Sequence, residues 1–140
     1  MSRVFWDTNL FIYLLEGSGE RARRVVSLRE RMLARGDQLY TSALTLGEIL
    51  VKPAEAGDTT LQQEYEQTLS AGAVIVPFDQ PAARAYAVIR RDRNIRPTDA
   101  IQLACAVCAR VDLFITNDER LRQTVIPGIQ FVTSLDKAFL

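Results

Sequence analysis

Five short apolar runs separated by longer helical segments constrain the fold more than any other feature of the sequence. The runs are continuous rather than alternating in polarity, which indicates strands that are buried on both faces. Strands of this kind, separated by helices, form a parallel sheet with helices on both sides. We therefore expect a three-layer α/β/α sandwich with a mostly parallel central sheet. The predicted strands are residues 3–6, 38–41, 73–78, 112–116 and 129–133.

The segments between these runs have helical patterns. Residues 8–16 are almost wholly apolar and stop at Gly17, so we expect a helix that is buried on most sides. Residues 20–35 are amphipathic and end at Gly36. Pro53 is expected to end the next helix, because a proline removes a hydrogen bond from a helix interior. The remaining predicted helices are 44–51, 58–70, 81–93 and 97–110.

Length and composition predict one globular domain over residues 1–140. The chain is 48% hydrophobic and 24% charged, which is typical of a folded protein rather than a disordered one. Its apolar run LFIYLL falls far short of the roughly 20 residues that cross a bilayer. The chain also opens without the pattern of a secretory signal peptide. We expect a cytoplasmic protein that does not engage a membrane.

Histidine is absent from the chain, which excludes Ser-His-Asp and Cys-His catalysis. The two cysteines, Cys105 and Cys108, lie three residues apart in an apolar helical stretch. A zinc site needs further cysteine or histidine ligands, and the sequence has none. We therefore expect both cysteines to serve packing, which leaves carboxylates, hydroxyls and arginines for chemistry.

Two aspartates come directly after predicted strands. Asp7 follows the first strand, and Asp118 follows the run LFIT by two residues. In a parallel sheet, ligands bind at the carboxyl ends of the strands, so both side chains are expected at that edge. Each also has a simpler explanation, because Asp7 can cap the helix that begins at Thr8 and Asp118 can cap a turn.

Two further acids lie near the starts of predicted helices. Glu48 is in TLGEIL and Asp99 is in RPTDAIQLA. Asp99 can simply favour the positive end of the helix that Pro97 opens, and Glu48 can complete a capping box with Thr45. Taken singly, capping is the favoured interpretation of each acid, and the functional hypothesis depends on their combination.

Four motifs in order resemble those of the PIN-domain ribonucleases, and most closely the VapC-type toxins of toxin–antitoxin modules. They are an apolar strand followed by DTN, then SALTLGE, RPTDAIQLACA and LFITND, and they cover nearly the whole chain. The resemblance implies a PIN-like fold and a site made of four acids with hydroxyl or amide neighbours. The acids are Asp7, Glu48, Asp99 and Asp118, and the neighbours are Thr8, Asn9, Thr116 and Asn117.

Four carboxylates in one crevice need a cation, since two like charges 4 Å apart repel by about 4 kcal/mol at an effective dielectric of 20. Oxygen ligands suit Mg²⁺ or Mn²⁺. The hypothesis is metal-assisted hydrolysis of an RNA phosphodiester. Glu48 would orient or deprotonate the attacking water, and the resemblance implies products with a 5′-phosphate. The expected metal ligands are Asp7, Asp99 and Asp118.

The last motif departs from its relatives in one respect. Many relatives carry an aromatic residue a few positions past the last acid, where this chain has Leu121. Glu119, directly after Asp118, is a second candidate ligand.

Arginines are concentrated in two strips although the chain has no net charge. Residues 20–35 hold six arginines and two acids, and residues 84–96 hold five arginines and one acid, a net +4 in each strip. Solvated helix faces and phosphate contacts are equally good explanations. The candidates for RNA binding are Arg90, Arg91 and Arg96.

The resemblance also implies partners, namely a homodimer and a small antitoxin that covers the site. Two other functions stay open. One is a PIN-fold module that binds RNA or assembles without turnover. The other is an aspartate-based phosphatase or phosphoacceptor, although such a phosphatase needs a second aspartate where this chain has Asn9.

Overall fold

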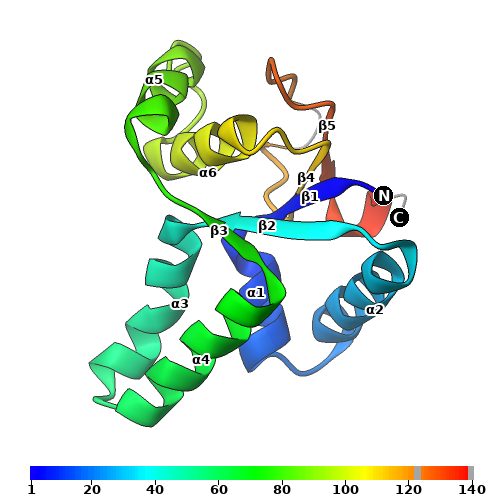
Figure 1. Cartoon of the computed structure of the whole chain (residues 1–140), viewed down its shortest axis with the longest axis vertical. Coiled ribbons are helices and arrows are strands. Elements are labelled where there is room, and N and C mark those ends of the chain that lie inside the picture. The colour runs from blue at the N-terminus through cyan, green and yellow to red at the C-terminus, as the bar shows by residue number, and fades with distance from the viewer. Residues whose placement is uncertain (122–123, 139–140) are drawn as a thin grey trace.

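Five parallel strands form a single sheet at the centre of the molecule (Figure 1). The computed structural model describes residues 1–121 and 124–138. The strand order is β3-β2-β1-β4-β5, so β1 lies in the middle and the chain reverses its direction of travel across the sheet there. The strands are β1 (Arg3–Trp6), β2 (Gln38–Ser42), β3 (Val74–Val76), β4 (Leu113–Thr116) and β5 (Phe131–Ser134).

Helices cover both faces of this sheet, which confirms the predicted α/β architecture. The described residues contain six α-helices and one short 3₁₀ helix, η1 (Leu135–Lys137). Figure 1 shows α5 and α6 on one face and the other four α-helices on the opposite face. The α-helices are α1 (Thr8–Glu16), α2 (Glu20–Arg35), α3 (Ala43–Glu55), α4 (Thr59–Gly72), α5 (Gln80–Ile89) and α6 (Pro97–Cys108). None of the helices in the described ranges is long and apolar enough to cross a membrane.

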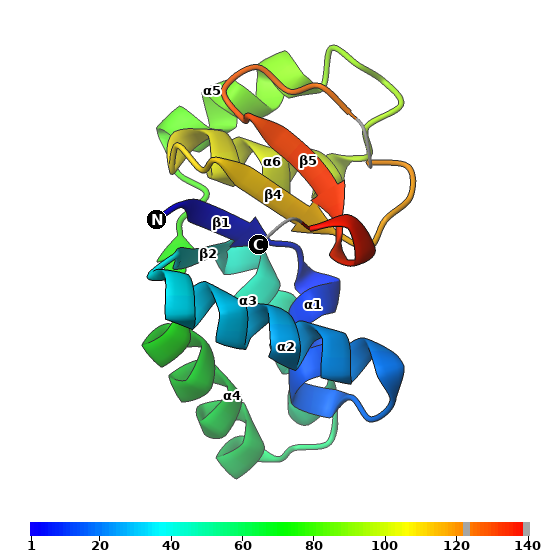
Figure 2. The same ribbon diagram turned by 90° about the vertical axis from the view of Figure 1, so that its right-hand side faces the viewer.

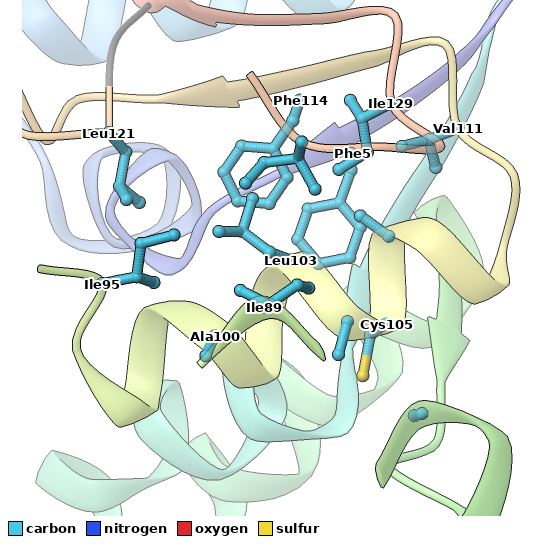
Figure 3. Packing of buried hydrophobic residues seen from close by; sticks show 14 of the residues in the cluster. Phe5, Ile89, Ile95, Ala100, Leu103, Cys105, Val111, Phe114, Leu121 and Ile129 are labelled. Atoms are coloured by element: carbon cyan, nitrogen blue, oxygen red, sulfur yellow. The ribbon is translucent and has the colours of Figure 1, made fainter. Parts of the chain in front are cut away.

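Strand β1 is buried on both sides, and its side chains divide between two hydrophobic clusters. Phe5 belongs to the cluster beneath α5 and α6, where its ring stacks on Phe114 of β4 with centroids 5.0 Å apart (Figure 3). Val4 and Trp6 point to the other face, where the Trp6 ring lies 5.3 Å from that of Phe11 in α1. Alternate side chains of a strand face opposite sides, which explains the continuous apolar run.

Four predicted helix ends differ from the structure, and one of them is that of α4, which ends at Gly72 instead of residue 70. Helix α3 continues past Pro53 to Glu55, because the proline lies in the last turn, where it costs one backbone hydrogen bond and is itself buried. Helix α5 ends at Ile89 instead of residue 93. The Arg90 guanidinium donates to the Ile95 carbonyl at 2.6 Å, in the loop that leads to α6. Helix α6 ends at Cys108 instead of residue 110.

The parallel arrangement brings all carboxyl ends of the strands to one edge of the sheet. Figure 2 shows the arrowheads of β1, β4 and β5 pointing the same way, with α1 leaving from the end of β1. Helix α3 begins directly after β2, and Asp118 follows β4 by two residues. Side chains from distant parts of the sequence therefore meet at this edge.

Candidate functional site

Asp7 lies at the centre of the site, between β1 and α1. Its backbone N–H donates to the Ile115 carbonyl at 3.0 Å, which continues the pairing of β1 with β4. Its side chain then caps α1, because Oδ1 accepts from the Thr8 backbone N–H at 2.8 Å. The other oxygen, Oδ2, accepts from the Thr116 hydroxyl at 2.8 Å. The residue is only 8% exposed, so capping and burial hold this carboxylate in a fixed place.

Burial raises the pKa of the Asp7 carboxyl above its usual value. Hydrogen bonds from Thr116 and from the Thr8 backbone lower this pKa again without cancelling the effect of burial. The nearby negative charges of Asp99 and Glu48 raise it further. Asp99 and Glu48 are therefore each close enough to repel the Asp7 carboxylate.

Glu48 projects from the second turn of α3 toward Thr8, the residue after Asp7. The Thr8 hydroxyl donates to Glu48 Oε1 at 3.0 Å, so Thr8 contacts Asp7 through its backbone and Glu48 through its side chain. The capping-box alternative for Glu48 is wrong. Ser42 is the N-cap of α3, and its side chain accepts from the Thr45 N–H, so Thr45 lies inside the helix rather than at its cap.

Gln102, which the sequence analysis did not single out, connects three of the elements that build the site. It is buried in α6, and its Nε2 donates to the hydroxyls of Thr45 and Thr8 at 2.8 and 2.9 Å. Asp7 Oδ1 lies 3.3 Å from the same nitrogen. On its other side, Gln102 Oε1 accepts from the Ser42 hydroxyl. The available signal was a lone amide one helical turn after Asp99 in an otherwise apolar helix.

Asp99 and Asp118 are joined by two arginines. The Arg96 Nε lies 3.1 Å from Asp99 Oδ2, and its Nη2 lies 3.2 Å from Asp118 Oδ2. Arg120 donates to Asp118 from Nε to Oδ1 at 3.1 Å and from Nη2 to Oδ2 at 2.6 Å. The same Nη2 lies 4.0 Å from Asp99 Oδ2. Hydrogen bonds from Arg120 hold the pKa of the Asp118 carboxyl below its usual value. The sequence analysis passed over Arg120, although it lies two residues after Asp118.

The remaining candidates occupy different positions around these acids. Thr116 joins two of them, since its hydroxyl donates to Asp7 and accepts from the Asp118 N–H at 3.0 Å. Asn117 donates to the Tyr13 hydroxyl at 3.0 Å instead of to a carboxylate. Asn9 is exposed on α1.

The other residues that the sequence analysis named differ in their exposure to solvent. Glu119 is exposed beside Asp118, and Arg91 is exposed in the loop after α5. Leu121 is buried and belongs to the cluster beneath α6, on the side of Ile95 (Figure 3). At the aromatic position of the relatives, this chain therefore places an aliphatic core residue.

The packing role predicted for the two cysteines is confirmed for Cys105 and is wrong for Cys108. Cys105 is buried in the same cluster, with its Sγ 3.8 Å from the Pro77 carbonyl oxygen. Burial raises the pKa of its thiol to about 12, so it stays protonated and unreactive. Cys108 is exposed, and no disulfide joins the two.

The donor set fits a hard divalent cation. It consists of carboxylates, hydroxyls and one amide, which are the ligands that Mg²⁺ and Mn²⁺ prefer. Within residues 1–121 and 124–138, however, no three acidic or sulfur-bearing side chains are grouped so that they could enclose an ion. The ion pairs explain this arrangement, because Arg96 and Arg120 lie against Asp99 and Asp118 while Asp7 and Glu48 are held through Thr8.

Several solved structures of toxin–antitoxin or VapBC complexes have a similar fold. A toxin–antitoxin complex from Klebsiella pneumoniae matches at 24% identity and a TM-score of 0.67, over 90% of this chain and 94% of that one. VapBC2 from Rickettsia felis, bound to a promoter DNA fragment, matches at 14% identity and 0.73, over 94% and 98%. DNA-bound VapBC from Salmonella typhimurium matches at 22% identity and 0.70, over 96% and 99%.

Comparison with protein families gives a match over most of the sequence, whereas no curated protein sequence matches significantly. The match is to the PIN domain and covers residues 4–126. This range runs from β1 to beyond β4 and includes all four acids described above. The motifs, the parallel five-stranded sheet and the family match agree, and the chain belongs to the PIN-domain family.

Proposed function

We propose that this protein is a metal-dependent endoribonuclease and the toxin of a type II toxin–antitoxin system. One observation carries the proposal: a buried Asp7 carboxylate whose pKa is raised by burial and by the charges of Asp99 and Glu48, at the ligand-binding edge of a PIN fold. Capping alone does not require a carboxylate to be buried beside two further acids, whereas a site for chemistry does.

Asp7, Asp99 and Asp118 are the proposed ligands of Mg²⁺ or Mn²⁺. A bound ion would supply Lewis acidity that activates water and offsets charge on the phosphoryl oxygens. Thr116 keeps Asp7 Oδ2 in place through its hydroxyl, and the cap to Thr8 does the same for Oδ1. Thus the chain holds Asp7 rigidly, while Asp118 remains closer to solvent.

Glu48 is the proposed general base. Its Oε1 accepts from Thr8, which orients the carboxylate toward Asp7 and leaves Oε2 to take the proton of the attacking water. Water rather than the RNA 2′-hydroxyl then attacks the phosphorus, and the products carry a 5′-phosphate and a 3′-hydroxyl.

Arginines beside the acids are the proposed contacts for the RNA backbone. Arg96 lies at the start of α6 next to Asp99, and Arg91 is exposed in the preceding loop. Arg90 is less available, because its guanidinium already donates to the Ile95 carbonyl. Arg90 stays a proposed RNA contact, but only through the guanidinium N–H groups that do not bond the Ile95 carbonyl.

Partners are proposed from the structural relatives. Those from Klebsiella pneumoniae, Rickettsia felis and Salmonella typhimurium are toxin–antitoxin or VapBC complexes, which supports a small antitoxin as the partner of this chain. We also propose a homodimer that acts on RNA in the cytoplasm.

RNA cleavage by the purified protein tests the activity. Wild type, Asp7→Asn and Asp99→Asn are incubated with a mixed RNA pool in Mg²⁺ or Mn²⁺, with and without EDTA. We expect cleavage by wild type that EDTA abolishes, and a loss of at least about 100-fold in both variants. Cleavage in EDTA, or full activity of both variants, would refute the mechanism. RNA binding without cleavage would assign the alternative function of a binding module.

A further inference from the structure

We propose that Arg120 exchanges partners during the reaction: it neutralises Asp118 in the metal-free protein and binds the RNA phosphate once an ion occupies the site. The inference rests on the proposed function and adds a phosphate-positioning residue to it. Among the described residues, Arg120 makes the most extensive contact with any of the four acids. Its Nε, Nη2 and backbone N–H all point to the Asp118 carboxylate, at 3.1, 2.6 and 2.9 Å.

Negative charge is in excess at the site in the metal-free protein. Asp7, Glu48, Asp99 and Asp118 carry a formal charge of −4, and the guanidinium groups of Arg96 and Arg120 supply +2 beside two of them. One divalent ion supplies the same +2. An ion held by Asp7, Asp99 and Asp118 would compete for the Asp118 oxygens that now accept from Arg120, and the displaced guanidinium becomes available to a further anion.

Exposure and reach allow this exchange. The carboxylates are recessed, with 11% of the Asp99 side chain and 15% of the Asp118 side chain exposed. Arg96 and Arg120 are more than half exposed, so their guanidinium groups contact the acids from the solvent side. Ion pairs with an exposed partner contribute little to stability, so replacing such a partner costs little. A phosphate offers Arg120 the same bidentate geometry as a carboxylate.

Arg120 is better suited to the exchange than Arg96. Arg96 is the N-cap residue of α6 and contacts both Asp99 and Asp118, so its side chain stays tied to the helix start. Arg120 lies in the turn after Asp118, outside any helix or strand, and its side chain can rotate without moving an element. The exchange predicts positive coupling, because the ion releases Arg120 toward phosphate and bound phosphate draws Arg120 away from Asp118.

Two binding measurements on the full chain test the exchange. Mn²⁺ affinity is measured by electron paramagnetic resonance, and affinity for a nucleoside 5′-monophosphate, which has no phosphodiester to hydrolyse, is measured by calorimetry with and without Mn²⁺. We expect Arg120→Met to bind Mn²⁺ several-fold more tightly than wild type, since a competitor for Asp118 is removed. We also expect Mn²⁺ to strengthen nucleotide binding in wild type and to do so several-fold less in Arg120→Met.

Arg110→Met is the matched control. It removes the same charge at the opposite edge of the sheet, between α6 and β4, and is expected to keep wild-type values in both measurements. Arg120→Lys keeps the charge but not the bidentate geometry and is expected to fall between wild type and Arg120→Met.

The outcomes separate the two proposals. If Arg120→Met retains the wild-type coupling between Mn²⁺ and nucleotide, Arg120 stays on Asp118 and the exchange is refuted, whereas metal-dependent RNA cleavage by wild type stands. If wild type binds no Mn²⁺, both proposals fail.

Discussion

Asp7 combines two roles that any single aspartate after a strand could have. It caps α1 through the Thr8 N–H, and it brings a negative charge into a buried position near Asp99 and Glu48. The cap stabilises the helix, but the charge does not stabilise the fold, because desolvation raises the pKa of this carboxyl. The loss of folding stability that the site causes therefore falls mainly on Asp7.

Asp7→Asn is expected to stabilise the protein while abolishing RNA cleavage. Asparagine keeps an Oδ1 that accepts from Thr8, and its N–H₂ can donate to the Thr116 hydroxyl, which reverses the direction of that bond and removes the charge. The melting temperature at neutral pH should rise by a few degrees, about the effect of 1 kcal/mol. Differential scanning calorimetry measures it, with Asp92→Asn in an exposed loop as the control.

The pH dependence of this gain follows from the raised pKa. A carboxyl whose folded-state pKa lies above its unfolded value takes up a proton first in the folded state. Wild type therefore gains stability relative to Asp7→Asn as the pH falls through the folded pKa, and the difference closes near the unfolded value of 3.8. An advantage of the variant that grows toward acid pH would contradict this account.

Gln102 is expected to stabilise the fold around the site, although it is not one of the proposed metal ligands. Gln102→Leu leaves the hydroxyls of Ser42, Thr45 and Thr8 with fewer partners in a buried place, which should cost about 1 to 3 kcal/mol of unfolding free energy. Urea unfolding measures the cost. Gln67→Leu on exposed α4 should be neutral within about 0.5 kcal/mol.

A charged variant distinguishes hydrogen bonding from shape at this position. Gln102→Glu keeps the size of the side chain but turns a carboxylate toward Asp7, so it should be less stable at neutral pH and recover as the pH falls. Equal stability of Gln102→Glu and wild type at neutral pH would show that the amide donates nothing essential.

At the scale of elements, the helix starts determine where the acids lie. Three acids follow from three boundaries: β1 to α1 for Asp7, β2 to α3 for Glu48, and the loop before α6 for Asp99. At the first two boundaries a strand ends, a polar side chain caps the next helix, and the first turns of that helix present side chains to the sheet edge. Helix α6 instead follows a loop, and its N-cap residue, Arg96, makes no capping hydrogen bond with its side chain. The caps are visible in the sequence, although the wrong cap was expected for α3, where Ser42 and not Thr45 takes the position.

Asp58 gives a direct measure of one such cap. It is the N-cap of α4, and its Oδ1 accepts from the Leu61 N–H at 3.0 Å. Asp58→Ala should lower the free energy of unfolding by about 1 kcal/mol, and Asp58→Asn should restore most of it. Urea denaturation tests this, with Glu64→Ala on the exposed face of α4 as the control. A neutral Asp58→Ala would show that packing alone holds the start of α4.

At the scale of the whole molecule, charge is arranged locally on a protein with no net charge. RNA attraction must then come from the arginines beside the site rather than from the overall field. Arg91 is exposed in the loop after α5, whereas Arg90 is partly buried and donates to the Ile95 carbonyl. The two neighbours therefore differ in what their reversal should do.

Arg91→Glu should weaken RNA binding several-fold and make its salt dependence shallower by about one unit of slope, with no loss of stability. Arg90→Glu should instead lower the melting temperature, since the loop hydrogen bond is lost. Fluorescence anisotropy between about 50 and about 200 mM salt, together with thermal melting, checks both. RNA affinity that is unchanged at low salt would show that Arg91 is only a solvated side chain.

The sequence by itself determined the α/β class, the approximate strands and helices and the family resemblance. Apolar periodicity, caps and motif order are local properties that survive without knowledge of any contact. It could not show that α3 passes Pro53 or that α5 stops at Ile89, because those ends depend on packing and on a loop hydrogen bond. It also missed Gln102 and Arg120, whose significance lies in their partners.

Only the tertiary structure decided which polar side chains meet. Gln102 reaches Thr8 and Asp7 across about 95 residues of chain, and Arg96 bridges Asp99 to Asp118 across the gap between α6 and β4. Such contacts depend on the strand order, which places β4 beside β1. No local sequence pattern encodes this order. The acids could be named from sequence, but the ion pairs that Asp99 and Asp118 make with arginines follow from how the sheet brings these segments together.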